Sequence, residues 1–121
     1  MSSEAFNEPE AALSPDDFRE LTELHDMASN ACELLKAMAN EWRLMILCQL
    51  SEGEKTVSEL QRLLGLSQSA LSQHLAVLRR QKIVVARKQA QSVSYSLSGD
   101  EATKVMETLH DLFCGDRNTK D

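Results

Sequence analysis

The stretch "LSQSALSQHLAVLRR", residues 66–80, decides how this chain is organised. Leu71, Leu75 and Leu78 repeat with helical spacing, so one face of a helix here is predicted to be buried. The opposite face carries short or neutral hydrogen-bonding side chains: Gln68, Ser69, Ser72, Gln73 and His74. Such groups match the donors and acceptors on base edges in the major groove of DNA. We therefore predict that these five residues read DNA bases.

A shorter helix and a glycine turn precede this stretch. Thr56 and Glu59 have the spacing of a capping box, which predicts a helix running to about Leu64. Gly65 can adopt the left-handed conformation that ends a helix, and Ser67 can cap the next one. A short helix, a tight turn and a longer helix with a polar face together indicate a helix-turn-helix.

After Lys82 the apolar period changes from that of a helix to that of a strand. Residues 83–88, "IVVARK", and 92–97, "SVSYSL", are rich in β-branched residues and predict two strands. A basic two-stranded wing after a helix-turn-helix indicates a winged helix. Its cationic side chains suit DNA phosphates, which position a protein without specifying sequence; those assigned to the DNA backbone are Arg79, Arg80, Lys82, Arg87 and Lys88.

Two helices are predicted before the helix-turn-helix. Ser14 and Pro15 fit the start of a long helix. Its small and apolar residues recur at alternating spacings of three and four, as in a coiled coil: Leu21, Leu24, Ala28, Ala31, Leu35 and Met38. This seam fits either a second subunit or the core of the same chain. Asn40 can then cap a second helix that ends near residues 51–53.

The last helix is expected after the wing. Ser98 and Glu101 have the spacing of a second capping box, opening a helix through Cys114 that Gly115 ends.

These elements predict a mainly α domain with a two-stranded β-wing, in the order helix–helix–helix–helix–strand–strand–helix. We expect one winged helix-turn-helix domain over residues 15–115 and a homodimer held by the first and last helices. Residues 1–14 are expected to form a disordered acidic tail, and residues 116–121 a frayed tail.

The charge distribution supports a nucleic-acid partner despite the net charge of −6. Residues 60–99 hold six of the 13 basic side chains and none of the 19 acidic ones, so this block carries +6 and the remainder −12. A local basic block of this kind is typical of a phosphate-binding surface, although clustering on a solvated surface is the alternative.

The sequence argues against several other classes of protein. No apolar run approaches the roughly 20 residues that cross a bilayer, and the acidic start lacks the order of a signal peptide. We expect a cytoplasmic protein with free thiols, no membrane partner and no cofactor. P-loop, GxGxxG and HExxH motifs do not occur, so an enzyme is not expected.

Three stretches resemble the ArsR (SmtB/ArsR) family of dimeric winged-helix repressors: "LLKAMANEWRLMILCQL" at 34–50, "TVSELQRLLGLSQSALSQHLAVLRRQKIV" at 56–84 and "VSYSL" at 93–97. The resemblance covers about residues 31–114. Cys48 and Cys114 are similar to the paired cysteines of its SqrR, BigR and HlyU subgroup. The resemblance implies a homodimer that binds a palindromic operator and releases it when a persulfide, polysulfide or oxidant joins these two cysteines by a disulfide or polysulfide bridge.

The residues themselves leave alternatives open. Cys48 lies in an apolar stretch, where a buried cysteine is commonly a small hydrophobe, and the helix dipole does not stabilise a thiolate at Cys114. Cys32 matches no motif and is interpreted as structural. His110 and Cys114 are four apart, so together with Cys48 they offer a zinc-type metal sensor as the alternative. An activator that displaces a silencer, or a sequence-blind architectural DNA binder, would use the same fold.

Overall fold

A computed structural model describes residues 14–115 of the chain. The chain divides between Cys32 and Glu33 into two compact units. The first described helix, α2 (Pro15–Met38), runs from one unit into the other, and all later elements belong to the second unit. The predicted acidic tail, apart from Ser14, and the predicted C-terminal tail lie outside the described residues.

Helix α2 begins as the sequence predicted. The Ser14 hydroxyl accepts a hydrogen bond from the Asp17 amide at 3.0 Å, and Pro15 is the first helical residue. Most of its large apolar side chains are exposed in the single chain, Leu21, Leu24 and Leu35 among them, whereas Met38 is buried in the core. Most of the seam therefore does not pack into the core of its own chain.

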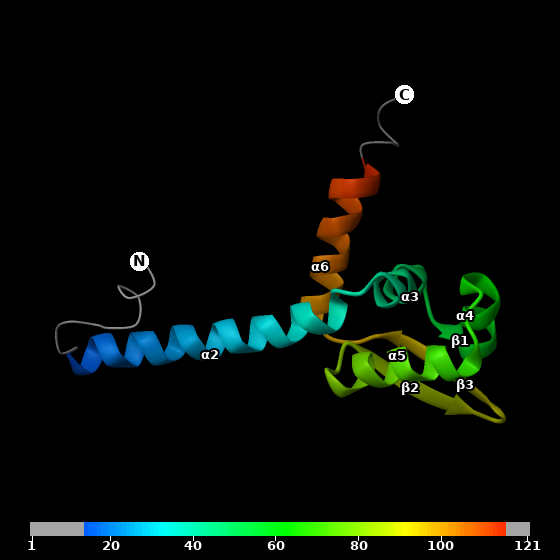
Figure 1. Cartoon of the computed structure of the whole chain (residues 1–121), viewed down its shortest axis with the longest axis horizontal. Helices are drawn as coiled ribbons and strands as arrows, with labels where there is room; N and C mark the ends of the chain where they lie inside the picture. Colours follow the sequence, from blue (N-terminus) through cyan, green and yellow to red (C-terminus); the bar gives the residue numbers. More distant parts are fainter. Residues whose placement is uncertain (1–13, 116–121) are drawn as a thin grey trace, which may run out of the picture. The chain divides into compact units, whose positions relative to one another are not determined.

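The helix-turn-helix is confirmed in detail. After α3 (Glu41–Ser51), which Asn40 caps, a short strand leads into α4 (Val57–Leu64). The Thr56 hydroxyl accepts from the Glu59 amide at 3.1 Å, and the Glu59 carboxylate accepts from the Thr56 amide at 2.8 Å. Gly65 follows with a φ of +70°, and Ser67 caps α5 (Gln68–Arg80). Figure 1 shows α4 and α5 as successive helices joined by this turn.

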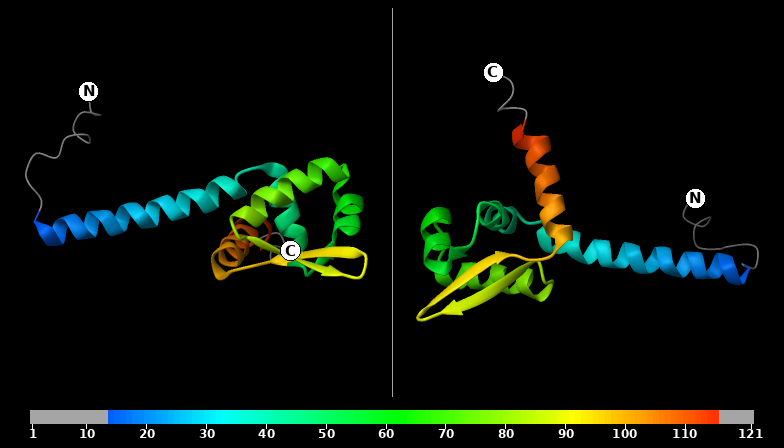
Figure 2. Two further views of the ribbon diagram at one scale, coloured as in Figure 1. Left: turned by 90° about the horizontal axis from the view of Figure 1, so that it is seen from below. Right: turned by 180° about the vertical axis from the view of Figure 1, so that it is seen from behind.

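The wing is an antiparallel hairpin of β2 (Val84–Gln89) and β3 (Ser92–Leu97). Figure 2 shows this hairpin projecting from the helices of the second unit. A third strand, β1 (Lys55–Thr56), was not predicted because two residues give no periodicity; it pairs with Tyr95 and Ser94. β3 is consequently the middle strand of a three-stranded sheet, and Ser94 on it is buried.

The last helix differs from the prediction at both ends. Helix α6 (Asp100–His110) has Gly99 at its N-cap, with no side-chain capping bond, so the predicted capping box at Ser98 and Glu101 is wrong. The helix begins one residue later than that box requires, which places Ser98 outside the N-cap. At the other end the predicted α-helix gives way to a π-helix, η1 (Asp111–Gly115), which contains Cys114.

One core lies beneath α5. Leu71, Leu75 and Leu78 are fully or almost fully buried, as the helical spacing predicted. The rest of the core comes from the end of α2, from α3, α4, β2, β3 and α6, and from Ile83 just before β2: Ala37, Met38, Ile46, Leu47, Leu50, Leu60, Ile83, Val84, Tyr95, Ala102 and Met106. Over residues 14–115, none of the helices combines the length and apolar character that a membrane span requires.

The two capping predictions make a matched pair of stability tests. Thr56→Ala should lower the free energy of unfolding by about 1 kcal/mol, because it removes an N-cap acceptor. Ser98→Ala should lower it by less than about 0.5 kcal/mol, as expected for a substitution away from a cap. Urea unfolding followed by circular dichroism measures both. Equal losses for the two variants would contradict the capping assignments.

Candidate functional site

Four of the five predicted base readers form one exposed surface of α5. Gln68, Ser69, Ser72 and Gln73 are all exposed. Gln68 lies one turn before Ser72, and Ser69 one turn before Gln73. They occupy the first two turns of the helix. We call these four residues the reading face.

The fifth, His74, is placed differently. It is half-buried, and its Nδ1 lies 3.4 Å from Nη1 of Arg43 on α3. The Arg43 guanidinium also donates to the backbone carbonyls of Lys36 and Ala37 at the end of α2. His74 therefore contacts α3, and its reading of DNA bases stays a prediction. The sequence spacing accounts for the partial burial of His74. It follows Leu71 by three residues and precedes Leu78 by four, which places it beside these buried leucines.

The cations assigned to the DNA backbone are all exposed, but one of them is already paired. Arg79, Arg80, Lys82 and Lys88 make no ion pair within residues 14–115. Arg87 on β2 instead donates to both carboxylate oxygens of Glu54, at 2.9 and 2.7 Å. The hydrogen bond from Arg87 lowers the pKa of Glu54, and the same bond raises the pKa of Arg87. Sequence reasoning missed Glu54 because it lies 33 positions away.

Lys82 closes α5 in a conformation that usually belongs to glycine. Its φ is +61°. The Lys82 amide donates a hydrogen bond to the Arg79 carbonyl, and the Ile83 amide donates one to the Leu78 carbonyl, both at 2.9 Å. This is the Schellman arrangement, in which a left-handed residue ends the helix. A non-glycine residue pays steric strain there.

A notch lies between the second half of α5 and strand β3. It has a volume of about 470 Å³ and is lined by Ser72, Ala76, Arg79, Arg80 and Tyr95. The Tyr95 hydroxyl has no hydrogen-bond partner among the described residues. Since every fully buried polar side-chain atom in this part of the chain has a hydrogen-bond partner, the Tyr95 hydroxyl is not fully buried and reaches solvent. The sequence predicted only that Tyr95 lies on the second strand of the wing.

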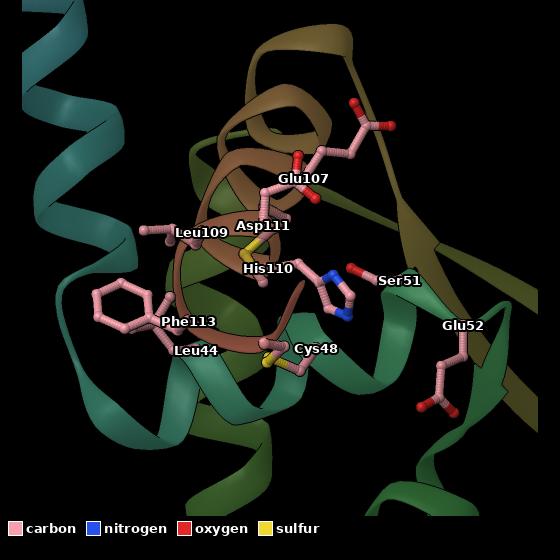
Figure 3. Close-up of a pocket in the computed structure, with 11 residues that line it drawn as sticks. Leu44, Cys48, Ser51, Glu52, Glu107, Leu109, His110, Asp111 and Phe113 are labelled. Atoms are coloured by element: carbon pink, nitrogen blue, oxygen red, sulfur yellow. The ribbon is translucent and has the colours of Figure 1, made fainter. Parts of the chain in front are cut away.

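The two cysteines assigned to sensing line one pocket, which no residue of α5 or the wing lines. Cys48 comes from α3 and Cys114 from η1, two elements far apart in sequence. The pocket has a volume of about 520 Å³; Figure 3 shows residues from both elements around it. Its other lining residues are Leu44, Ser51, Glu52, Met106, Glu107, Leu109, His110, Asp111 and Phe113.

Cys48 is exposed, so it is not the small buried hydrophobe that its apolar sequence context offered as an alternative. The buried side of α3 is formed by Ile46, Leu47 and Leu50, and Cys48 faces the pocket instead. The pocket walls partly desolvate the thiol and raise its pKa, and the negative charges of Cys114 and Glu52 raise it further. Its thiolate is therefore scarce at neutral pH. Cys32 is also exposed, on α2.

The metal-sensor alternative finds little support in this pocket. Cys48, His110 and Cys114 all line it, yet no group of three or more His, Cys, Asp or Glu side chains in the described part of the chain is arranged to hold a metal ion. The four-residue spacing of His110 and Cys114 places both on one face only if they lie in a continuous α-helix. Because Cys114 lies in a π-helix, where bonds join residues five apart, that relation is changed.

Comparison with known proteins points to one family. Residues 40–85 match the model of the bacterial regulatory protein, arsR family. The chain is 54% identical to the transcriptional activator HlyU of Vibrio cholerae over 94 residues, covering 78% of this chain and 87% of HlyU. It is 39% identical to a biofilm growth-associated repressor of Agrobacterium fabrum, again over 94 residues, covering 78% of this chain and 80% of the repressor.

A solved structure agrees with these sequence matches. Reduced HlyU from Vibrio cholerae superposes with a TM-score of 0.74 at 54% sequence identity, covering 76% of this chain and 97% of that one. The winged helix-turn-helix, the family match and the relatives are consistent with one another. The chain belongs to the ArsR family of bacterial transcriptional regulators.

Proposed function

We propose that this protein is a cytoplasmic, dithiol-based transcriptional repressor that responds to reactive sulfur or oxidants. It binds a palindromic operator as a homodimer and releases the DNA when Cys48 and Cys114 become linked. The observation that carries the proposal is the shared pocket, which brings together two cysteines from α3 and η1.

The DNA contacts are assigned to two surfaces of the second unit. The reading face of α5 contacts base edges, where each well-placed pair contributes roughly 1–3 kcal/mol of discrimination. Phosphates are bound by exposed cations on and after α5 and on the wing: Arg79, Arg80, Lys82, Arg87 and Lys88. The notch containing Tyr95 lies among these cations, so its free hydroxyl is suited to a phosphate oxygen as well.

A homodimer supplies the second reading face that a palindrome requires, with half-sites about 34 Å apart along the duplex. The exposed apolar side chains of α2 are one support for this assembly. Leu112 and Phe113 of η1, 64% and 70% exposed, are an independent one. In the single chain, the apolar side chains of α2 and of η1 both expose surface to water, and a second subunit would bury this surface.

The proposed switch needs only the sulfur donor as oxidant. A donor RSSH transfers its outer sulfur to Cys48, giving a Cys48 persulfide and RSH. The Cys114 sulfur then attacks the inner sulfur of that persulfide, and H₂S leaves as a disulfide forms. If Cys114 also carries a persulfide, the same condensation leaves a trisulfide and H₂S. Hydrogen peroxide gives the plain disulfide by way of a sulfenic acid, with water released at each step.

Helix α3 offers a route from the bridge to the DNA. Cys48 lines the pocket, and Arg43 on the same helix contacts both His74 of α5 and the last carbonyls of α2. Tying α3 to η1 shifts this contact and the orientation of the reading face. A coupling of roughly 1–3 kcal/mol is typical of allosteric regulators and changes operator affinity several-fold or more.

A second function is favoured by one relative. HlyU of Vibrio cholerae is described as a transcriptional activator, so this chain is equally suited to raise transcription by displacing a silencer from the same DNA. The thiol switch and the DNA contacts are unchanged under that function. Transcription from the operator in the presence and absence of the silencer separates the two.

Substitution of the two pocket cysteines tests the proposed sensor. Cys48→Ser and Cys114→Ser should each bind a DNA site selected on the reduced wild-type protein with unchanged affinity, because neither residue is near the reading face. Both variants should keep that affinity after treatment with sodium disulfide, while the wild type loses it several-fold. Fluorescence anisotropy of labelled DNA measures the binding.

The matched control is Cys32→Ser, which removes the remaining thiol and should respond as the wild type does. A Cys114→Ser protein that still releases DNA on sulfide oxidation would refute the dithiol pair. Release caused by zinc and lost in His110→Ala would favour the metal sensor.

The pairing of Arg87 with Glu54 gives a separate prediction for DNA binding. Glu54→Gln should raise affinity about equally for every DNA sequence, because it removes a carboxylate that competes with phosphate for Arg87. It should also steepen the dependence of affinity on salt, because more counterions are released when Arg87 is free. Anisotropy titrations at several salt concentrations measure both effects.

Glu23→Gln, on the exposed surface of α2, is the matched control, since it changes the net charge equally without touching Arg87. A fall in affinity on Glu54→Gln would instead show that Glu54 holds Arg87 in its binding position. Because the pKa of Glu54 is lowered, the wild-type pair should persist at neutral pH and break only as the pH falls below the usual range of a glutamate.

A further inference from the structure

The pocket that holds the two thiols has an unbalanced charge. Glu52, Glu107 and Asp111 line it, and no Lys or Arg of the described part does. The six residues that follow Gly115 in the sequence contain two basic and two acidic side chains, so they add no formal net charge. His110 is the one lining residue in this part that can become cationic.

We propose that this pocket ranks sulfur donors RSSH by the charge of the group R that they carry, favouring a compact uncharged or cationic R over an anionic one. The inference rests on the proposed function of Cys48 and Cys114 as the sensing thiols. It adds the chemical class of the molecule that reaches them, which neither the family nor the pairing of the thiols defines.

The pocket walls strengthen the effect of the carboxylates. Leu44, Met106, Leu109 and Phe113 form an apolar lining, next to which the negative charges are located. Charges beside low-dielectric walls produce stronger potentials than the same charges in open water, and they change the local concentration of an ionic reactant. A donor with an anionic body therefore enters a site that repels it over its whole approach.

Two of the three carboxylates supply most of the uncompensated negative charge. Glu52 lies 3.7 Å from Lys55, so a nearby cation offsets part of its charge. Glu107 and Asp111 make no ion pair among residues 14–115. Both line the pocket and are exposed; Glu107 belongs to α6, and Asp111 begins η1, which also contains Cys114.

The sulfur transfer that follows binding balances with the donor alone. In sulfur transfer the Cys48 sulfur bonds to the outer sulfur of RSSH, the S–S bond of the donor breaks, and the electron pair leaves with RS⁻. The proton given up by Cys48 returns to that sulfur, and RSH departs.

Thiosulfonates of different charge test the selection without any DNA. A methanethiosulfonate converts a thiol to a mixed disulfide and releases methanesulfinate, so its rate reports access of the reagent to one cysteine. Three reagents are compared on the reduced full-length protein: an uncharged methyl, a cationic trimethylammonium-ethyl and an anionic sulfonatoethyl derivative. Rapid quenching and peptide mass spectrometry give separate rates for Cys48, Cys114 and Cys32.

For each cysteine we take the rate with the cationic reagent divided by the rate with the anionic reagent. This ratio should be at least about tenfold higher at Cys48 than at Cys32, because clefts lined by charges of one sign change the association rates of ions by about that much or more. Each ratio is first divided by that of free cysteine. The double variant Glu107→Gln, Asp111→Asn should lower the ratio at Cys48 several-fold, and high salt should lower it too. Glu20→Gln, Glu23→Gln on α2 should leave it unchanged.

Equal ratios at Cys48 and Cys32, or a ratio that the pocket double variant does not change, would overturn the charge selection. This outcome is distinct from failure of the sensor itself. If Cys48→Ser and Cys114→Ser abolish DNA release while the ratios are flat, only the charge selection fails. If those variants still release DNA while the ratios differ as expected, the pocket is selective but is not the sensor.

Discussion

The burial of Leu71, Leu75 and Leu78 is the interaction on which the functional surface depends. These side chains hold α5 against the core in one rotation about its axis, because turning the helix would bring polar groups into a dry interior. The reading face is exposed for that reason, and the notch beside Tyr95 is formed by the same orientation. The exposed amides and hydroxyls are therefore positioned by an apolar contact on the opposite side of the helix.

Helix α3 connects this surface to the thiol pocket. Its buried residues face the same core, Cys48 faces the pocket, and Arg43 reaches α5 and the end of α2. Arg43 and Cys48 are separated by five residues, or about 7.5 Å along a helix. A short, well-packed helix moves as a unit, so a covalent bond at one position changes the contacts at the other. This is the physical basis of the proposed link between sulfur chemistry and DNA release.

Local chemistry explains which parts of this structure were predictable. The Thr56–Glu59 capping box, the left-handed Gly65 and the buried leucine stripe all follow from residues within four positions of one another. The failures involve choices that neighbouring residues do not determine. Strand β1 exists because β3 is available to pair with it, the N-cap of α6 is offset by one residue from the predicted box, and η1 departs from α-helical bonding.

The candidate site divides in the same way. The exposure of the reading face was expected from its spacing, whereas the engagement of Arg87 by Glu54 and of His74 by Arg43 needed the tertiary fold, since each pair is more than 30 positions apart. The raised pKa of Cys48 likewise depends on pocket walls contributed by a distant helix.

The central claim is that one covalent bridge, within one subunit, turns DNA binding off. The most direct measurement mixes ¹⁵N-labelled and unlabelled protein, treats it with sodium disulfide, separates DNA-bound from released protein and maps unreduced peptides by mass spectrometry. The account predicts a Cys48–Cys114 link, as a disulfide or with added sulfur atoms, enriched in the released fraction and joining peptides of the same isotope only. Mixed-isotope links, a link through Cys32, or released protein with both thiols unlinked would contradict it.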